Sequence, residues 1–204
     1  MSKNEAFIVA AIGASGSGKT AWVKSQLRRG KPRRLLIYDP MEEYSEFGPV
    51  FTDRAALADA VLQAGKGAFC GVFQPGGSTE TYAEKFDWIC RLAFAWGACT
   101  FVADELGDVT KAGWSPPGWS HVIRKGRHKG MRVFGLVQRP ALTDKTFFSL
   151  ATLVHCGRLN FDSDIKVMQD VLRVERAAAA DLANLEWIER DMGTGATRTG
   201  KLTF

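Results

Sequence analysis

Short apolar runs alternate with amphipathic segments along most of this chain. The runs are rich in Val, Ile, Leu, Phe and Ala, end at Gly, Pro or charged residues, and cover 6–12, 34–38, 68–73, 99–103, 132–137 and 153–159. Continuous apolar runs of this length are typical of strands buried on both faces. Apolar residues at helical spacing lie between them, at 19–29, 54–64, 80–96, 118–128 and 163–172. The alternation predicts an α/β fold with a mostly parallel central sheet and helices on both faces.

Length and composition narrow the class of protein. The chain has 204 residues, of which 46% are hydrophobic and 24% charged, so it is neither disordered nor fibrous. Its length predicts a single domain spanning 1–204. No uncharged apolar stretch approaches the roughly 18 residues that a membrane-spanning helix needs, and residues 1–5 show no signal-peptide pattern. We therefore expect a cytoplasmic protein without a transmembrane segment.

The cysteines and histidines do not lie at the sequence spacing typical of metal ligands. The four cysteines lie far apart in apolar surroundings and form no C-x-x-C pair, so we interpret them as reduced core residues. His121 and His128 stand without Cys or acidic residues at ligand spacing. Both are interpreted as parts of a basic helix.

Positive charge is unevenly distributed. The formal net charge is +5, but residues 1–34 hold eight basic side chains and one acid, and residues 120–132 hold five basic side chains and no acid. Such clusters suit a polyanionic partner. Solvated helix faces are the alternative interpretation.

One glycine-rich segment matches the pattern G-x-x-x-x-G-K-[ST]. It consists of Gly13, Ala14, Ser15, Gly16, Ser17, Gly18, Lys19 and Thr20. Because it joins a predicted strand to a predicted helix, its backbone N–H groups and the helix N-terminus can hold the phosphates of ATP or GTP. Lys19 would reach the β- and γ-phosphates, and the Thr20 hydroxyl would bind Mg²⁺. An accidental glycine-rich turn is disfavoured by the flanking strand and helix.

Two adjacent acids, Asp104 and Glu105, follow the apolar run 99–103. At the carboxyl edge of a parallel sheet, Asp104 would lie near the Mg²⁺ bound by Thr20. Glu105 could then act as general base on the attacking water, which favours hydrolysis. The alternative is an ordinary pair of acids that begins a solvated loop.

Two further polar residues close predicted strands. Gln138 follows the run 132–137, where its amide could hydrogen-bond the γ-phosphate or the water, or simply end the strand before Pro140. Asp39 could lie in the second shell of Mg²⁺ or serve as a turn residue before Pro40. The residues alone do not separate these roles.

Together these pieces resemble the FtsK–HerA superfamily of DNA-pumping P-loop ATPases. The motifs that carry the resemblance are Gly13–Thr20, Tyr38–Asp39–Pro40 with Glu43 and Tyr44, Asp104–Glu105, Arg124–Lys125–Gly126–Arg127–His128, Gln138–Arg139–Pro140 with Asp144–Lys145, and Cys156–Phe161 with Asp162–Ser163–Asp164. They cover about the whole chain. The Gln-Arg-Pro element after a Gly-Arg helix is the specific part, because the P-loop alone would be generic.

The resemblance implies a RecA-like P-loop NTPase. A solitary motor domain of about this length is similar to the genome-packaging ATPases of tailless viruses and phages with an internal membrane. We therefore expect a homomeric ring, a hexamer, that uses ATP to drive double-stranded DNA through a basic channel. Its further partners would be capsid or viral membrane-vertex proteins, and its location the host cytoplasm or the virion.

A ring ATPase of this kind would need an arginine finger, a cation that a neighbouring subunit inserts to stabilise the charge on the transferring phosphoryl group. Arg127 and Arg158 are the first candidates, and Arg124 and Arg139 remain possible. For each arginine the alternatives are a phosphate contact with DNA or a surface ion pair.

The segment 106–119 departs from the family pattern because it is rich in Trp, Pro and Gly. Lys111 and Trp114 could meet phosphates and bases in a pore-side loop. The alternative is a surface loop pinned by its tryptophans. Three rival functions also stay open: a Zot-like morphogenesis ATPase of a filamentous phage, a small-molecule P-loop kinase, and a nucleotide-dependent switch without turnover.

Overall fold

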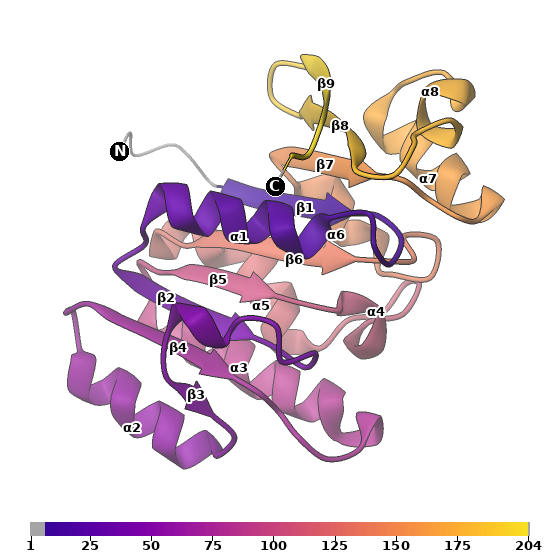
Figure 1. Ribbon diagram of the computed structural model, residues 1–204. Coiled ribbons are helices and arrows are strands. Elements are labelled where there is room, and N and C mark those ends of the chain that lie inside the picture. Colours follow the sequence, from indigo (N-terminus) through magenta and orange to yellow (C-terminus); the bar gives the residue numbers. More distant parts are fainter. Residues whose placement is uncertain (1–6, 204) are drawn as a thin grey trace.

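A computed structural model describes residues 7–203, and within this range the strands form one mixed sheet. Its strands are β1 Phe7–Ile12, β2 Arg34–Tyr38, β3 Val50–Phe51, β4 Phe69–Phe73, β5 Thr100–Ala103, β6 Arg132–Val137, β7 Leu153–Gly157, β8 Glu186–Asp191 and β9 Thr197–Lys201. They lie in the order β3-β4-β2-β5-β6-β1-β7-β8-β9 (Figure 1). Pairings are parallel from β3 to β7, whereas β8 and β9 add an antiparallel hairpin.

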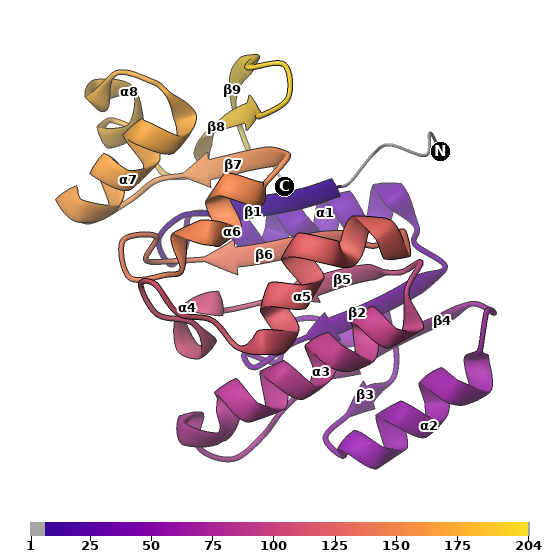
Figure 2. The same cartoon turned by 180° about the vertical axis from the view of Figure 1, so that it is seen from behind.

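Helices cover both faces of this sheet. They are α1 Lys19–Gly30, α2 Arg54–Ala64, α3 Tyr82–Trp96, α4 Leu106–Val109, α5 Pro117–Lys125, α6 Lys145–Leu150, α7 Asp162–Leu172 and α8 Arg176–Ala180, with 3-10 turns η1 Ser45–Phe47, η2 Thr79–Thr81 and η3 Gly126–Lys129. Figure 1 shows α1 in front of the sheet. Figure 2, seen from behind, shows α3, α5 and α6 on the opposite face.

Side-chain alternation along the central strands explains why both faces need a cover. In β1, Ala10 and Ile12 belong to the larger core cluster under α3 and α5, whereas Val9 and Ala11 belong to the cluster under α1. All four are fully buried. A strand with both faces apolar is stable only between two layers, so the apolar runs in the sequence specify a three-layer molecule.

The six predicted strands and five predicted helices are confirmed: three match at both ends, and the ends of the others differ by at most three residues. Residue 6, the predicted start of the first strand, lies outside the described residues. The sequence analysis missed β3, β8, β9, α4 and α6. Strand β3 and the two helices are very short, and the hairpin β8–β9 is polar and half-exposed, so none of them gives a long apolar run.

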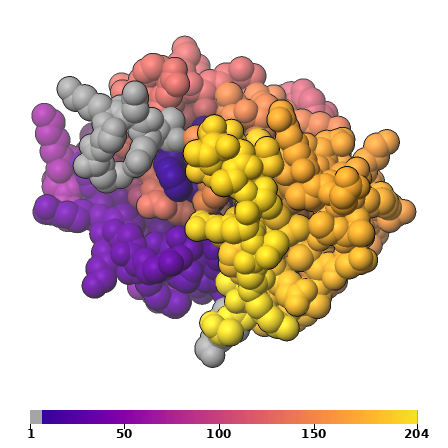
Figure 3. All heavy atoms as spheres, turned by 90° about the horizontal axis from the view of Figure 1, so that it is seen from above, coloured from indigo at the N-terminus to yellow at the C-terminus, as the bar shows by residue number. Residues whose placement is uncertain are grey.

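The hairpin extends the sheet beyond β7. Figure 3 shows the C-terminal residues, in yellow, as a band between the indigo N-terminal region and the orange α7 and α8. Among residues 7–203, no helix has the length and apolar character needed to cross a membrane. Cys90, Cys99 and Cys156 lie in the core as predicted, whereas Cys70 is only half-buried.

Candidate active site

The P-loop connects β1 to α1 at the carboxyl edge of the sheet, as the sequence predicts. The Gly13 N–H donates to the Val137 carbonyl at 3.1 Å, and the Ala14 N–H donates to the Arg158 carbonyl at 2.8 Å. Gly13 has φ of 154°, and a Cβ at this position would collide with the Ser17 side chain. Glycine is therefore required for the loop to close on itself beside the neighbouring strands.

Lys19 begins α1 and points back into the loop. Its Nζ lies 3.5 Å from the Ala14 carbonyl, and the residue is only 8% exposed. Burial lowers the pKa of Lys19, while the carboxylates of Glu105 and Asp104 favour its charged form. A buried ammonium at a helix N-terminus is suited to bind phosphate oxygens.

Thr20 is held by an acid that the sequence analysis did not place in the site. Its Oγ1 donates to Glu43 Oε2 at 3.1 Å. The turn that carries Glu43 is fixed by Asp39, whose buried carboxylate accepts the N–H groups of Glu43 and Tyr44 at 2.9 and 3.0 Å. Asp39 is therefore a turn residue that positions Glu43. An acid four residues after the Asp of a strand-ending Asp-Pro pair is the sequence signal that could have indicated it.

Asp104 lies at the end of β5, beside the P-loop. It is 3% exposed, and its Oδ1 accepts the Glu105 N–H at 3.0 Å. Burial, together with the neighbouring Glu105 carboxylate, raises the pKa of Asp104 to about 7. A positive charge near it would hold this carboxylate ionised.

Glu105 and Gln138 come together from separate strands. Gln138 follows β6 and donates from Nε2 to Glu105 Oε2 at 2.6 Å. Burial raises the pKa of Glu105, opposed by the hydrogen bond from Gln138. Glu105 also has left-handed backbone angles, φ 51° and ψ 54°. A non-glycine residue in this region is strained, and such strain occurs at functional sites where the surroundings fix the residue.

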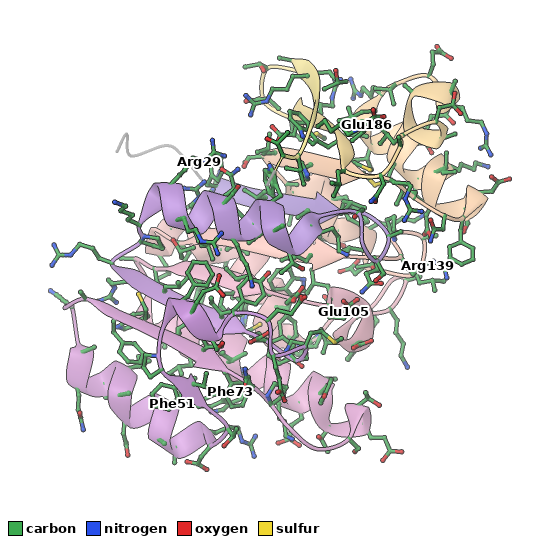
Figure 4. The ribbon with its side chains drawn as sticks, viewed as in Figure 1. Arg29, Phe51, Phe73, Glu105, Arg139 and Glu186 are labelled. Carbon is green, nitrogen blue, oxygen red and sulfur yellow. The ribbon has the colours of Figure 1, made fainter. Side chains whose placement is uncertain are left out.

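These side chains line one hollow of about 180 Å³. Its lining residues are Ser15, Gly16, Lys19, Thr20, Met41, Glu43, Asp104, Glu105 and Gln138. The structure thus brings the predicted P-loop residues, the Asp-Glu pair and the glutamine into one pocket. Figure 4 shows Glu105 at this edge of the sheet.

The donor set fits Mg²⁺ bound together with a nucleotide. The Thr20 hydroxyl and the Glu43 and Asp104 carboxylates offer oxygen atoms, which a hard octahedral cation prefers. Among residues 7–203, no group of three His, Cys, Asp or Glu side chains could hold a metal ion alone. This agrees with the general behaviour of Mg²⁺, which is commonly bound by one or two protein ligands plus phosphate oxygens and water.

Two candidate arginines lie at this same edge and contact their own chain. Arg158 follows β7, and its Nη2 lies 3.4 Å from the Ser15 carbonyl of the P-loop. Arg139 donates from Nε to the buried carboxylate of Asp164 at 2.7 Å and lies over the Phe161 ring. Both guanidinium groups are engaged within the chain, which favours local roles over insertion into a neighbour.

The other two candidates lie away from the pocket. Arg127 belongs to η3, directly before β6, and Arg124 lies in the last turn of α5, so both are at the amino edge of the sheet. The two basic clusters found in the sequence also meet there. Arg33 and Arg34 from one cluster and Arg132 from the other line a shared hollow of about 240 Å³.

The loop after β5 is more ordered than the sequence suggests. Residues Leu106–Val109 form α4, and Lys111 and Trp114 exchange backbone hydrogen bonds of 2.9 Å in a tight turn. Trp119 is fully buried and pins the loop to the core. Trp114 instead is 49% exposed, so its ring is available for contact.

Comparisons with known proteins agree with this geometry. No family model matches the chain. Protein P9 of Pseudoalteromonas phage PM2 is 30% identical to this chain over an aligned length of 204 residues. The alignment covers 95% of this chain and 89% of that protein.

Two solved structures show the same fold. The genome packaging NTPase B204 of Sulfolobus turreted icosahedral virus 2, in complex with AMPPCP, has a TM-score of 0.76 at 16% identity, covering 97% of this chain and 98% of that one. The N-terminal domain of zonular occludens toxin from Neisseria meningitidis has a TM-score of 0.54 at 17% identity, covering 98% and 94%. The fold is that of a RecA-like P-loop NTPase, and the chain belongs to the family of Protein P9.

Proposed function

We propose that this chain is a single motor domain that hydrolyses ATP to move double-stranded DNA, packaging a viral or phage genome. The observation that carries the ATPase part is the 2.6 Å hydrogen bond between Gln138 and Glu105 in the pocket that Lys19 and Thr20 also line. A phosphate-binding loop, a general base and an amide that can orient water are the parts needed for hydrolysis.

The residues divide the reaction between them. The loop N–H groups and Lys19 bind the phosphates. Thr20 and Asp104 would hold Mg²⁺, which would supply positive charge to offset that of the phosphates. Gln138 orients a water, and Glu105 accepts its proton as the water oxygen bonds to the γ-phosphorus. The bond from that phosphorus to the bridging oxygen breaks, and ADP leaves with the electron pair.

The proposed DNA contact is supported by the positive charge at the amino edge. Arg33 and Arg132 line one hollow, and Arg127 belongs to the adjacent turn. Arg34, which also lines the hollow, donates to four backbone carbonyls of its own chain and holds this edge together. Cations in such an arrangement bind phosphodiester backbones with little dependence on sequence. The likeness to B204, a genome packaging NTPase, supports packaging as the process.

The homomeric ring, a hexamer, is proposed from the resemblance to the FtsK–HerA superfamily. Arg139 and Arg158 contact their own chain, so we favour Arg127 of a neighbouring copy as the finger, with Arg124 as the alternative. The ring would act in the host cytoplasm or at the virion, where capsid or viral membrane-vertex proteins would hold it.

The test is phosphate release by the purified protein with and without duplex DNA. We expect DNA to raise the rate, Lys19→Ala to abolish turnover, and Glu105→Gln to bind ATP without hydrolysing it. Transfer of phosphate to a metabolite would indicate a kinase, and binding without turnover would indicate a switch. The likeness to the zonular occludens toxin domain, which would favour the filamentous-phage rival, is weaker than the likeness to B204. We therefore prefer packaging.

A further inference from the structure

The C-terminal hairpin reaches the junction between the P-loop and α1. Leu185 directly precedes β8 and Leu202 directly follows β9, and the Leu202 N–H donates to the Leu185 carbonyl at 2.9 Å. A Cβ built on Gly18 would lie 2.5 Å from Leu202 Cδ1 and 3.2 Å from Leu185 Cδ2. The two leucines therefore lie directly against the phosphate-binding loop.

This position is built into the core. Trp22 of α1 stacks on His155 of β7, with ring centroids 4.0 Å apart and an interplanar angle of 14°. His155 Nδ1 lies 2.9 Å from Glu189 Oε1 on β8, and Leu202 packs on the cluster that contains Trp22. The hairpin is thus joined to the helix that follows the P-loop, which fixes the leucines relative to the loop.

Two adjoining hollows share Gly16, Lys19, Thr20 and Glu43 in their linings. The first, of about 180 Å³, contains Glu105 and Gln138. The second, of about 340 Å³, is lined by Gly16, Gly18, Lys19, Thr20, Ala21, Lys24, Glu43 and Leu185. Because they share the P-loop residues, one extended nucleotide can occupy both.

The orientation of a nucleotide across the two hollows follows from the chemistry of the first hollow. This step rests on the proposed function, which puts the γ-phosphate beside Glu105 and Gln138. The ribose and base would then occupy the adjoining hollow, which Leu185 lines.

The polar side chains of this second hollow are already paired. The Thr20 hydroxyl donates to Glu43, the Lys24 Nζ lies 3.4 Å from Glu46 Oε2, and the Lys19 Nζ faces the Ala14 carbonyl. Leu185 is the remaining large side chain of the lining and has no hydrogen-bonding group.

We propose that Leu185, backed by Leu202, is the base-binding wall of the nucleotide site, which contacts the face of a purine without recognising its polar edge. A site that forms no hydrogen bonds to the groups by which adenine and guanine differ cannot discriminate strongly between them. The protein therefore accepts GTP as well as ATP, with kcat/KM values within about tenfold of each other.

The experiment measures binding of ATP, GTP and inorganic tripolyphosphate, each with Mg²⁺, to the full chain by calorimetry. Leu185→Ala should weaken both nucleotides about tenfold, the change expected when much of a leucine contact is removed, and leave tripolyphosphate unchanged. Leu202→Met keeps the volume and should have a smaller effect in the same direction. Leu62→Ala, at a leucine 74% exposed on α2, is the matched control.

The outcomes separate two failures. Equal weakening of tripolyphosphate and ATP by Leu185→Ala would mean that the leucine only supports the loop, and would overturn the proposal. Unchanged nucleotide binding, or a preference for one purine above about a hundredfold, would overturn it as well. If the wild type binds neither ATP nor tripolyphosphate, the proposed function itself fails, and the base wall with it.

Discussion

The two edges of the parallel strands carry opposite chemistry. At the carboxyl edge, Asp104, Glu105 and Gln138 line a pocket of acids and an amide around a single lysine. At the amino edge, Arg33 and Arg132 line a hollow, and the sequence 120–132 leading into it contains no acid. Figure 4 shows the separation: Arg29 lies near one end of the strands, and Glu105 and Arg139 near the other.

Strand direction explains how a chain with a net charge of only +5 achieves this. Because the strands from β3 to β7 run parallel, the segments that follow them lie at one edge and the segments that precede them at the other. Acids placed after strands and cations placed before them are therefore separated by the length of the strands. Magnesium and nucleotide would bind at one edge, and DNA phosphates at the other, without competition.

The largest expected effect is on the rate of ATP hydrolysis, and it depends on contact between the amino edge of one subunit and the carboxyl edge of the next. If Arg127 from the amino edge of one subunit enters the pocket of the next, Arg127→Ala should lower the rate about 10³- to 10⁵-fold while ATP still binds. Mixing this variant with Lys19→Ala should restore part of the activity, because some interfaces then combine an intact arginine with an intact P-loop. Steady-state phosphate release measures both.

Failure of the mixture to recover activity, in subunits shown to co-assemble, would contradict an Arg127 finger. Arg158→Ala provides the comparison, because its guanidinium lies on its own P-loop and mixing should not rescue it. Monomers that hydrolyse ATP at the full rate on dilution would contradict the ring.

The second effect concerns the carboxyl edge alone. Glu105→Gln removes the proposed base and keeps the side-chain size, so single-turnover hydrolysis should slow about 10²- to 10⁴-fold with ATP affinity retained. Glu84→Gln, at an exposed glutamate paired with Arg54, is the matched control. Hydrolysis by Glu105→Gln at the wild-type rate would show that the base is another group.

The third effect tests the amino edge. Log affinity for duplex DNA should fall with log salt, and replacing Arg29, Arg33 and Lys129 by Gln should make that slope less negative by about 0.9 for each phosphate that the protein no longer neutralises. Filter binding at several salt concentrations gives the slope. Arg54→Gln, remote from this edge, should leave the slope unchanged. An unaltered slope in the triple variant would show that DNA binds to another surface.

The fourth effect is smaller and concerns the loop after β5. Lys111 and the exposed Trp114 are a basic and an aromatic residue of this loop, so they are candidates for a second DNA contact in addition to the amino edge. Replacing both by Ala should reduce DNA stimulation several-fold and leave basal hydrolysis intact. Unchanged stimulation would identify the turn as a surface loop only.

Sequence reasoning found what depends on local pattern. Continuous apolar runs predicted the six long strands, and the spacing of the P-loop placed Lys19 and Thr20 correctly, because both signals lie within a few neighbouring residues. Glu43 was missed as a site residue because its position depends on a turn that Asp39 fixes through backbone hydrogen bonds. Such a contact produces no periodic pattern in the sequence.

The hairpin β8–β9 was missed for a different reason. Trp187 and Ile188 are surrounded by charged residues, and β9 carries almost no apolar side chain, so neither strand resembles a buried one. Its importance lies in what it contacts, namely the P-loop through Leu185 and Leu202. Pairing of residues that are distant in sequence could not be derived from the local pattern.

The smallest effect concerns His155, which lies on β7 between the two edges and faces Trp22 on α1, Glu189 and Trp187 on β8, and Arg198 on β9. Burial lowers the pKa of His155 below its ordinary 6.5, although the Glu189 carboxylate opposes the shift. Hydrogen bonds from His155 and Arg198 also lower the pKa of Glu189, outweighing burial, which would raise it. The unfolded chain therefore binds protons more readily than the folded one at both groups.

Stability from His155 is thus fully present above pH 6.5 and decreases as the pH falls from that value toward the lowered pKa of the folded state. In His155→Gln, which cannot titrate but can still donate to Glu189, the melting temperature should fall less between pH 7.5 and about 5.5. The expected difference is a few degrees, because about 1 kcal/mol changes the melting temperature of a domain this size by about 2–4 °C. His121→Gln, at an exposed histidine, should keep the wild-type dependence. Equal dependence in wild type and His155→Gln would show that His155 does not contribute to the pH dependence of stability in this range.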